Sequence, residues 1–221
     1  MEQISVPGGE TVFVERLENG LAVLVLPKKQ FVRTYGVLSV NYGSLDSQFQ
    51  TAGQGVVEVP PGIAHFLEHK LFEEPDGSVF DRFAALGGSV NAFTSYSQTS
   101  YLFTTVENWR ESLLYLLEFV NRLHLTEENV EKEKGIIEQE LRMYADHPDH
   151  RILSTLLENL YHQHPVRLDI GGTVESVRRI TKGELESCYH IFYQPGNMAL
   201  VVVGDLDPEE TCALVRAHYP R

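Results

Sequence analysis

The sequence has few of the residues that mark disulfide scaffolds, membrane spans and signal peptides. Among its 221 residues only Cys188 and Cys212 are cysteines, and neither stands in a C-x-x-C pattern. Two isolated thiols fit a reducing cytoplasm better than a disulfide scaffold, so we expect a cytoplasmic protein with both thiols in its core. No apolar run approaches the roughly 20 residues needed to span a membrane. Residues 1–10 carry acid, glycine and proline rather than a basic stretch and an apolar run, and so do not predict a secretory signal.

Basic residues are also scarce relative to acidic ones. The chain has 18 Lys and Arg against 31 Asp and Glu, which gives a formal net charge of −13. Such a surface repels nucleic acid and anionic membranes, and we expect neither as a partner. No G-x-x-x-x-G-K pattern occurs, so Gly87-Gly88 and Gly171-Gly172 predict turns rather than phosphate-binding loops. The hydrophobic fraction of 43% is typical of a globular protein with a full core.

Hydrophobic patterning predicts a single α+β domain over residues 1–221, with a mainly antiparallel sheet and helices packed on one face. Runs rich in β-branched and aromatic residues indicate strands, and Asn19-Gly20 indicates a hairpin between the first two. The expected strands are 11–14, 21–26, 34–42, two within 89–106, and 198–203. The expected helices are one around residue 65, then 78–86, 109–125, 127–145, 152–161, 181–193 and 207–219. Residues 46–61 show no period and predict a loop.

The most informative stretch is His65-Phe66-Leu67-Glu68-His69, which reads H-x-x-E-H. Residues four apart lie on one face of a helix, so His65 and His69 can offer two imidazoles to one metal ion. Glu68 points near the same side, within reach of a water held by the metal. This order of residues is the inverzincin motif. The alternative is a helix that places two histidines four apart by chance, and the apolar opposite side of the helix favours the metal site.

A third ligand is expected in the helix after Thr126, which is rich in glutamate. Glu127, Glu128 and Glu131 predict a solvated acidic face near the helix N-terminus. Glu133 and Glu140 lie seven apart on a face that also holds Ile136 and Ile137. At least one of these two glutamates therefore points toward the core, where a carboxylate needs a cation or hydrogen-bond donors.

Four further histidines lie between residues 147 and 164. Their spacing crosses a proline and suits no helical ligand pair, so we expect them at the surface. They are His147, His150, His162 and His164.

Several segments in order along the chain resemble the N-terminal half of pitrilysin/insulysin-type zinc metallopeptidases, close to the mitochondrial processing peptidase branch. The sequence is most similar to bacterial members whose names link them to modification of elongation factor P. The matching segments are 65–69, Gly-Ser-Val-Asn-Ala-Phe-Thr at 88–94, 133–141, Tyr-Gln-Pro-Gly-Asn-Met at 193–198 and Val-Gly-Asp at 203–205.

The resemblance implies a zinc endopeptidase acting on peptides or small unfolded proteins. It implies His65, His69 and Glu140 as zinc ligands, Glu68 as the general base and Glu133 as a carboxylate that supports the site. The interval from His69 to Glu140, 140 − 69 = 71 residues, is a few residues shorter than is usual in the family. Glu138 and Glu133 therefore stay open as alternative ligands.

The resemblance also assigns the segment around Asn91-Ala92 to an edge strand that pairs with an extended substrate, a case of β-augmentation. Read alone, these residues fit an ordinary strand equally well.

Members of the family are usually about twice this length, with two similar halves enclosing the substrate. The resemblance thus implies that a second homologous half, or a partner chain, completes the active-site chamber. We expect this chain by itself to be weakly active or inactive. The competing hypothesis is a non-catalytic peptide-binding or scaffold subunit that retains the fold and the metal. The intact motif favours the enzyme, because a scaffold has no need of Glu68.

Overall fold

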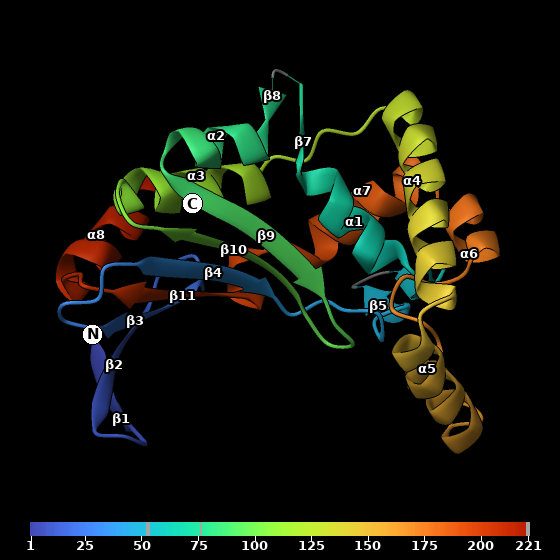
Figure 1. Ribbon diagram of the computed structural model, residues 1–221, viewed down its shortest axis with the longest axis horizontal. Helices are drawn as coiled ribbons and strands as arrows, with labels where there is room; N and C mark the ends of the chain where they lie inside the picture. Colours follow the sequence, from blue (N-terminus) through green and yellow to red (C-terminus); the bar gives the residue numbers. More distant parts are fainter. Residues whose placement is uncertain (52–53, 76, 220–221) are drawn as a thin grey trace.

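The computed structural model describes residues 1–51, 54–75 and 77–219, and its centre is a seven-stranded sheet with the order β1-β2-β3-β11-β4-β10-β9. Neighbouring strands are antiparallel except β11 and β3, which are parallel. The strands are β1 (Glu2–Val6), β2 (Glu10–Arg16), β3 (Ala22–Pro27), β4 (Thr34–Val40), β9 (Gly88–Thr94), β10 (Thr99–Thr105) and β11 (Met198–Gly204). The order places β9 at one edge of the sheet (Figure 1).

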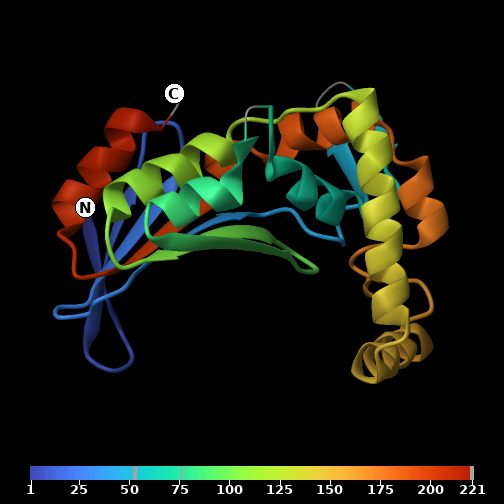
Figure 2. The same cartoon turned by 45° about the horizontal axis from the view of Figure 1, so that its top comes forward.

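Helices cover one face of this sheet, as the sequence predicts, with α2, α3 and α8 above the strands in Figure 2. The helices are α1 (Ile63–Leu71), α2 (Val79–Ala85), α3 (Trp109–Val120), α4 (Glu127–Ala145), α5 (Pro148–Leu160), α6 (Val174–Arg179), α7 (Lys182–Phe192) and α8 (Pro208–His218). Beside the sheet, α1 packs against the long α4, and α5 extends away from the body of the molecule (Figures 1 and 2). Among the described residues, no helix is long and apolar enough to cross a membrane.

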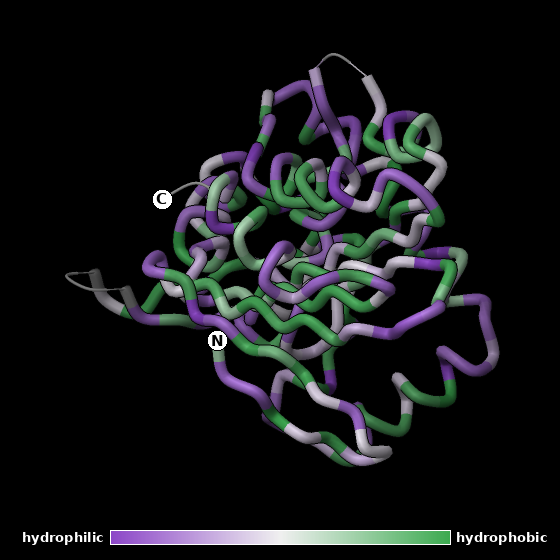
Figure 3. Tube along the Cα trace, turned by 90° about the vertical axis from the view of Figure 1, so that its left-hand side faces the viewer, coloured by the Kyte–Doolittle hydropathy of each residue, from purple (hydrophilic) through white to green (hydrophobic). Residues whose placement is uncertain are grey.

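The core forms because alternate residues of the central strands point toward the helices. Leu38 of β4, Tyr101 and Phe103 of β10, and Leu200 and Val202 of β11 are all fully buried. Figure 3 shows hydrophobic stretches running through the centre of the molecule. The expectation for the cysteines is confirmed, since Cys188 and Cys212 are free and buried.

The hairpin predicted at Asn19-Gly20 is confirmed. It joins β2 to the antiparallel β3, and Gly20 has a φ of 94°, a conformation that glycine adopts without strain. A Cβ at Gly20 would lie 2.8 Å from the Cα of Gly196, so the turn also requires a residue without a side chain at this position.

The structure corrects the sequence reading in several places. Residues 46–61 are not all loop, because β5 (Gln48–Thr51) and β6 (Gln54–Glu58) pair as a hairpin; residues 52 and 53 lie outside the described residues. Phe49 and Val57 pack against the core and hold this hairpin in place. The helix expected at 152–161 begins at Pro148, since proline suits the first helical turn. The helix expected at 109–125 ends at Val120, and β1, α6 and the short pair β7 (Glu73–Glu74) and β8 (Gly77–Ser78) were not predicted.

Candidate metal centre

The helix α1 carries the H-x-x-E-H motif and is fixed by its apolar side. Phe66, Leu67 and Leu71 are at most 1% exposed, which turns His65 and His69 toward the opposite side. The helix begins after Gly62, whose φ is 92°. A Cβ at Gly62 would lie 2.3 Å from the carbonyl oxygen of Gly171. Only glycine at position 62 therefore lets the loop before α6 pack against the start of α1. The predicted histidine helix is therefore present, and its start is locked against residues 171–172.

The helix α4 faces α1 and brings two glutamates toward the histidines. Thr126 caps α4 in a reciprocal pair with Asn129, and Ile137 is fully buried beneath the helix. Glu133 and Glu140 lie one turn to either side of Ile137, as the heptad spacing predicts. Ile136 was placed on this face wrongly, because it is 45% exposed.

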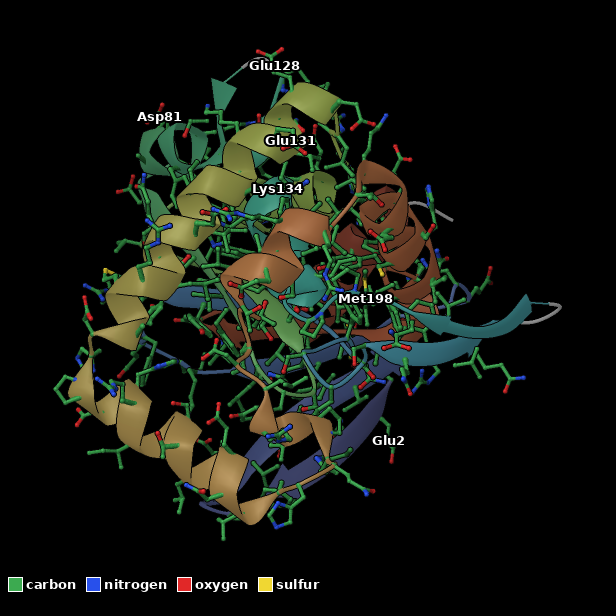
Figure 4. The ribbon with its side chains drawn as sticks, turned by 90° about the vertical axis from the view of Figure 1, so that its right-hand side faces the viewer. Glu2, Asp81, Glu128, Glu131, Lys134 and Met198 are labelled. Atoms are coloured by element: carbon green, nitrogen blue, oxygen red, sulfur yellow. The ribbon has the colours of Figure 1, made fainter. Side chains whose placement is uncertain are left out.

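Three other glutamates of α4 face solvent, as predicted. Glu127, Glu128 and Glu131 are exposed, and Glu131 pairs with Lys134 at 2.6 Å (Figure 4).

Two imidazoles and one carboxylate converge between α1 and α4. The Nε2 atoms of His65 and His69 are 3.2 Å apart, and the Oε2 of Glu140 lies 3.8 Å and 3.4 Å from them respectively. The three ligand atoms lie within 4.8 Å of one another. Tetrahedral zinc with bonds of about 2.0–2.1 Å separates its ligand atoms by roughly 3.3 Å. The donor set and its spacing therefore fit a zinc ion.

The two alternative third ligands point elsewhere. Glu138 makes a bidentate pair with Arg178, at 2.6 Å and 2.9 Å, on the surface of the molecule. Glu133 accepts a hydrogen bond from the Nδ1 of His69 at 2.9 Å, on the far side of that ring from Glu140. This contact places the proton of neutral His69 on Nδ1 and leaves the Nε2 lone pair directed at the metal position. Glu133 thus lies where a supporting carboxylate belongs, and Glu140 lies where a ligand belongs.

Without a metal the two histidines differ in charge. Burial and the nearby His69 lower the pKa of His65 to about 4, which keeps its imidazole neutral. Burial also opposes charging of His69, but hydrogen bonds to Glu133 and Glu140 outweigh it and raise the pKa of His69 to about 9. The hydrogen bond with His69 in turn lowers the pKa of Glu140. A metal ion entering this site would have to displace one proton, from His69.

Glu68 lies beside the histidines and accepts a hydrogen bond from a residue that was not predicted from the sequence. Its side chain is buried, which raises the pKa of its carboxyl group. The Oγ1 of Thr94, at the end of β9, donates a 2.6 Å hydrogen bond to one carboxylate oxygen, Oε2. Thr94 is the last residue of the segment 88–94 that resembles the family. Its hydroxyl was the one feature of the sequence that could have indicated a partner for Glu68.

The site opens into a cleft of about 440 Å³ whose rim is formed by the edge strand. Asn91, Ala92, Phe93 and Thr94 of β9 line one side of this cleft. Since β9 is hydrogen-bonded to β10 alone among the described strands, the expected edge position of Asn91 and Ala92 is confirmed. The Ala92 N–H donates to the Asn91 side chain at 2.9 Å, so it is not committed to a neighbouring strand.

The other side of the cleft includes a histidine that was expected at the surface. His147, His162 and His164 are exposed, as predicted, whereas His150 is half-buried. Its Nε2 lies 2.7 Å from a carboxylate oxygen of Asp169, and both residues line the cleft. Among the described residues His150 forms no helical ligand pair, as predicted, and its contact with Asp169 could not be predicted because that partner comes from a distant loop.

Comparison with known proteins agrees with this geometry. The model of the insulinase family (peptidase family M16) matches residues 58–174, and that of the peptidase M16 inactive domain matches residues 179–220. The uncharacterized zinc protease YmfH of Bacillus subtilis is 52% identical over 94% of this chain and 49% of its own length. An uncharacterized zinc protease of Mycobacterium leprae is 32% identical over 72% of this chain and 37% of its own length.

Solved structures show the same relation. A protein described as an M16-like peptidase from Alicyclobacillus acidocaldarius superposes with a TM-score of 0.93 at 49% identity, covering 97% of this chain and 51% of that one. A protease from Helicobacter pylori gives a TM-score of 0.82 at 26% identity, covering 94% of this chain and 50% of that one. The chain thus spans about half the length of these relatives.

Proposed function

The chain belongs to the insulinase family of peptidases (M16), and from that premise we propose that it is the zinc-binding half of a zinc-dependent endopeptidase. The observation that carries the proposal is the convergence of His65, His69 and Glu140 beside a buried Glu68, at the floor of a cleft bordered by a free strand edge. Family relatives carry the name zinc protease, which agrees with the donor set found here.

In this proposal His65, His69 and Glu140 hold the zinc ion. When bound, zinc supplies Lewis acidity, making a water more acidic and polarising a peptide carbonyl. Glu68 accepts the proton of the attacking water and passes it to the leaving amine. Thr94 occupies one oxygen of Glu68 and fixes the direction of the carboxylate, which leaves the other oxygen for the water. Burial raises the pKa of Glu68, so the carboxylate is a stronger base than an exposed one.

The substrate is proposed to bind as an added strand along β9. A peptide of any sequence can pair with the free backbone groups of an edge strand, which suits an enzyme acting on peptides or small unfolded proteins. The contact between Asn91 and the Ala92 N–H would be exchanged for one with the substrate backbone. The strand ends at Thr94, so the paired peptide would pass beside Glu68.

A second homologous half is proposed to close the cleft, as a continuation of the chain or as a separate subunit. This chain covers only 49% of YmfH and 51% of the Alicyclobacillus acidocaldarius protein, which agrees with this proposal. Because this chain spans only about half the length of these relatives, we propose that it hydrolyses peptides weakly or not at all by itself. The link to elongation factor P and the cytoplasmic location stay predictions.

The competing function is a peptide-binding subunit without catalysis, and the match of residues 179–220 to the M16 inactive domain favours it. The matched segment, however, covers α7, β11 and α8, which carry none of the proposed ligands. The hydrogen bond that directs Glu68 favours the enzyme, because a binding subunit does not need an oriented base.

A Glu68→Gln substitution tests the proposal in the assembled protein, with this chain joined to its second half. We expect the variant to bind zinc as tightly as the wild type while hydrolysis of an unfolded polypeptide falls by about 10²–10⁴-fold. Glu138→Gln, which alters a glutamate of α4 that pairs with Arg178 and not with the histidines, is the control and should keep its activity. Undiminished hydrolysis by Glu68→Gln would refute the catalytic role, and brisk hydrolysis by the isolated chain would refute the requirement for a second half.

A further inference from the structure

A fully buried lysine lies directly behind the metal site. Lys70 follows His69 on α1, and its side chain has no exposed surface. Burying an ammonium group is costly unless anions and carbonyl oxygens surround it. A positive charge beside a proposed cation site is unexpected on simple Coulomb grounds, so its partners matter.

Among the described residues, three groups contact the Lys70 ammonium. It pairs with the Glu73 carboxylate of β7, and it donates a 3.2 Å hydrogen bond to the backbone oxygen of Asn129 near the start of α4. Its third neighbour is Glu133, whose Oε2 lies 4.0 Å from the Nζ of Lys70. The other oxygen of the same carboxylate, Oε1, accepts the hydrogen bond from the Nδ1 of His69.

The Glu133 carboxylate therefore bridges a metal-ligating imidazole and a buried ammonium. We propose that Lys70 is a positioning residue of the metal site, which acts through Glu133 to hold His69 in the orientation and tautomer that zinc requires. This inference rests on the proposed function, since it assumes that His69 ligates zinc. The Glu133 side chain is 12% exposed, so water contributes little to fixing its direction. Without the cation, one of the two contacts that orient this carboxylate is lost.

The alternative is that Lys70 only ties α1, β7 and α4 together. In that case its loss lowers the stability of the fold but leaves the zinc affinity of the folded protein unchanged. A third possibility is that Lys70 acts on zinc only through Coulomb repulsion. Removing its positive charge would then tighten zinc binding, whereas the proposed positioning role predicts weaker binding. The sign and the partner dependence of the change in zinc affinity separate these three cases.

The experiment measures zinc dissociation constants of the folded 221-residue chain by competition with a chromophoric chelator. The variants are Lys70→Met, which keeps the unbranched stem of the side chain but removes the charged amino group, Glu133→Gln, and the double substitution. Groups that support a metal-ligating histidine contribute about 10–100-fold to metal affinity. We expect about a tenfold loss for each single variant and no further loss for the double variant, because both act through the same hydrogen bond.

Glu73→Gln is the matched control, since it removes the other anionic partner of Lys70 without touching His69 or Glu133. We expect its zinc affinity to stay within threefold of the wild type. A tenfold loss in Glu73→Gln, an additive hundredfold loss in the double variant, or unchanged or tighter zinc binding by Lys70→Met would each overturn the inference.

If Lys70→Met alone does not fold, the double variant compared with Glu133→Gln keeps the test decisive, because removing both charges leaves neither one unpaired. Equal zinc affinities of those two variants support the inference, and a weaker double variant overturns it. A wild-type chain that binds no zinc would instead refute the proposed function itself.

Discussion

Replacing Glu140 with glutamine tests the ligand that the sequence left most open. The glutamine side chain has the same length but lacks the negative charge. The Oε2 of Glu140 is the only carboxylate oxygen that groups with the Nε2 atoms of both histidines among the described residues. Its removal should therefore weaken zinc binding more than any other single change on α4.

The expected magnitude follows from two opposing effects. Zinc bound by four protein ligands gains about 10–16 kcal/mol, or roughly 3 kcal/mol per ligand, which corresponds to about a hundredfold in affinity. Part of this loss is offset, because Glu140 also raises the pKa of His69, and zinc competes with the proton on that ring. We therefore expect the zinc affinity of Glu140→Gln to fall between about tenfold and a hundredfold at pH 7.5.

The assay is chelator competition on the folded chain, with circular dichroism to show that the variant keeps its fold. Glu138→Gln is the control, since Glu138 lies two residues away and pairs with Arg178 at the surface. Its zinc affinity should match the wild type. Glu140→Gln binding zinc within threefold of the wild type, or Glu138→Gln losing affinity, would refute the assignment of the third ligand.

Three further predictions concern the proton, the base and the fold of the site. Because the pKa of His69 is about 9 without metal, apparent zinc affinity should rise about tenfold per pH unit between pH 6.5 and 8.5 and level off above pH 9; a flat profile would show that binding displaces no proton. Thr94→Val should lower the peptidase rate of the assembled enzyme by about tenfold with its zinc content unchanged, while Thr94→Ser keeps the hydroxyl that orients Glu68 and restores the rate; equal rates would contradict the role of that hydrogen bond. Gly62→Ala should destabilise the chain by about 2 kcal/mol or more in urea unfolding, because its φ is 92° and the added Cβ would collide with the Gly171 carbonyl; an unchanged midpoint would contradict this.

The fold could be predicted because its signals are local. Asn19-Gly20 marks a hairpin through turn chemistry, and Thr126 marks a helix start through its hydroxyl. Both features depend on a few neighbouring residues, and both are confirmed. The hairpin within 46–61 was missed because its strands are short and are held by packing of Phe49 and Val57 against the distant core.

The same distinction applies to the site. His65, Glu68 and His69 could be predicted because one helix carries all three, at a spacing that helical geometry fixes. The choice among Glu133, Glu138 and Glu140 could not be made from α4 alone, since it depends on how α4 lies against α1. Thr94 and Lys70 were missed for a similar reason, because each matters through a single contact that only the tertiary structure creates.

The zinc content of the purified wild-type chain tests the central claim most directly. Elemental analysis after exhaustive dialysis against metal-free buffer should find one zinc ion per chain in the wild type and in Glu68→Gln, and less than a tenth of that in His65→Ala. The account requires this pattern because we propose His65 as a zinc ligand and Glu68 as the base rather than a ligand. A wild-type chain that retains no zinc, or a His65→Ala chain that retains a full equivalent, would contradict the account.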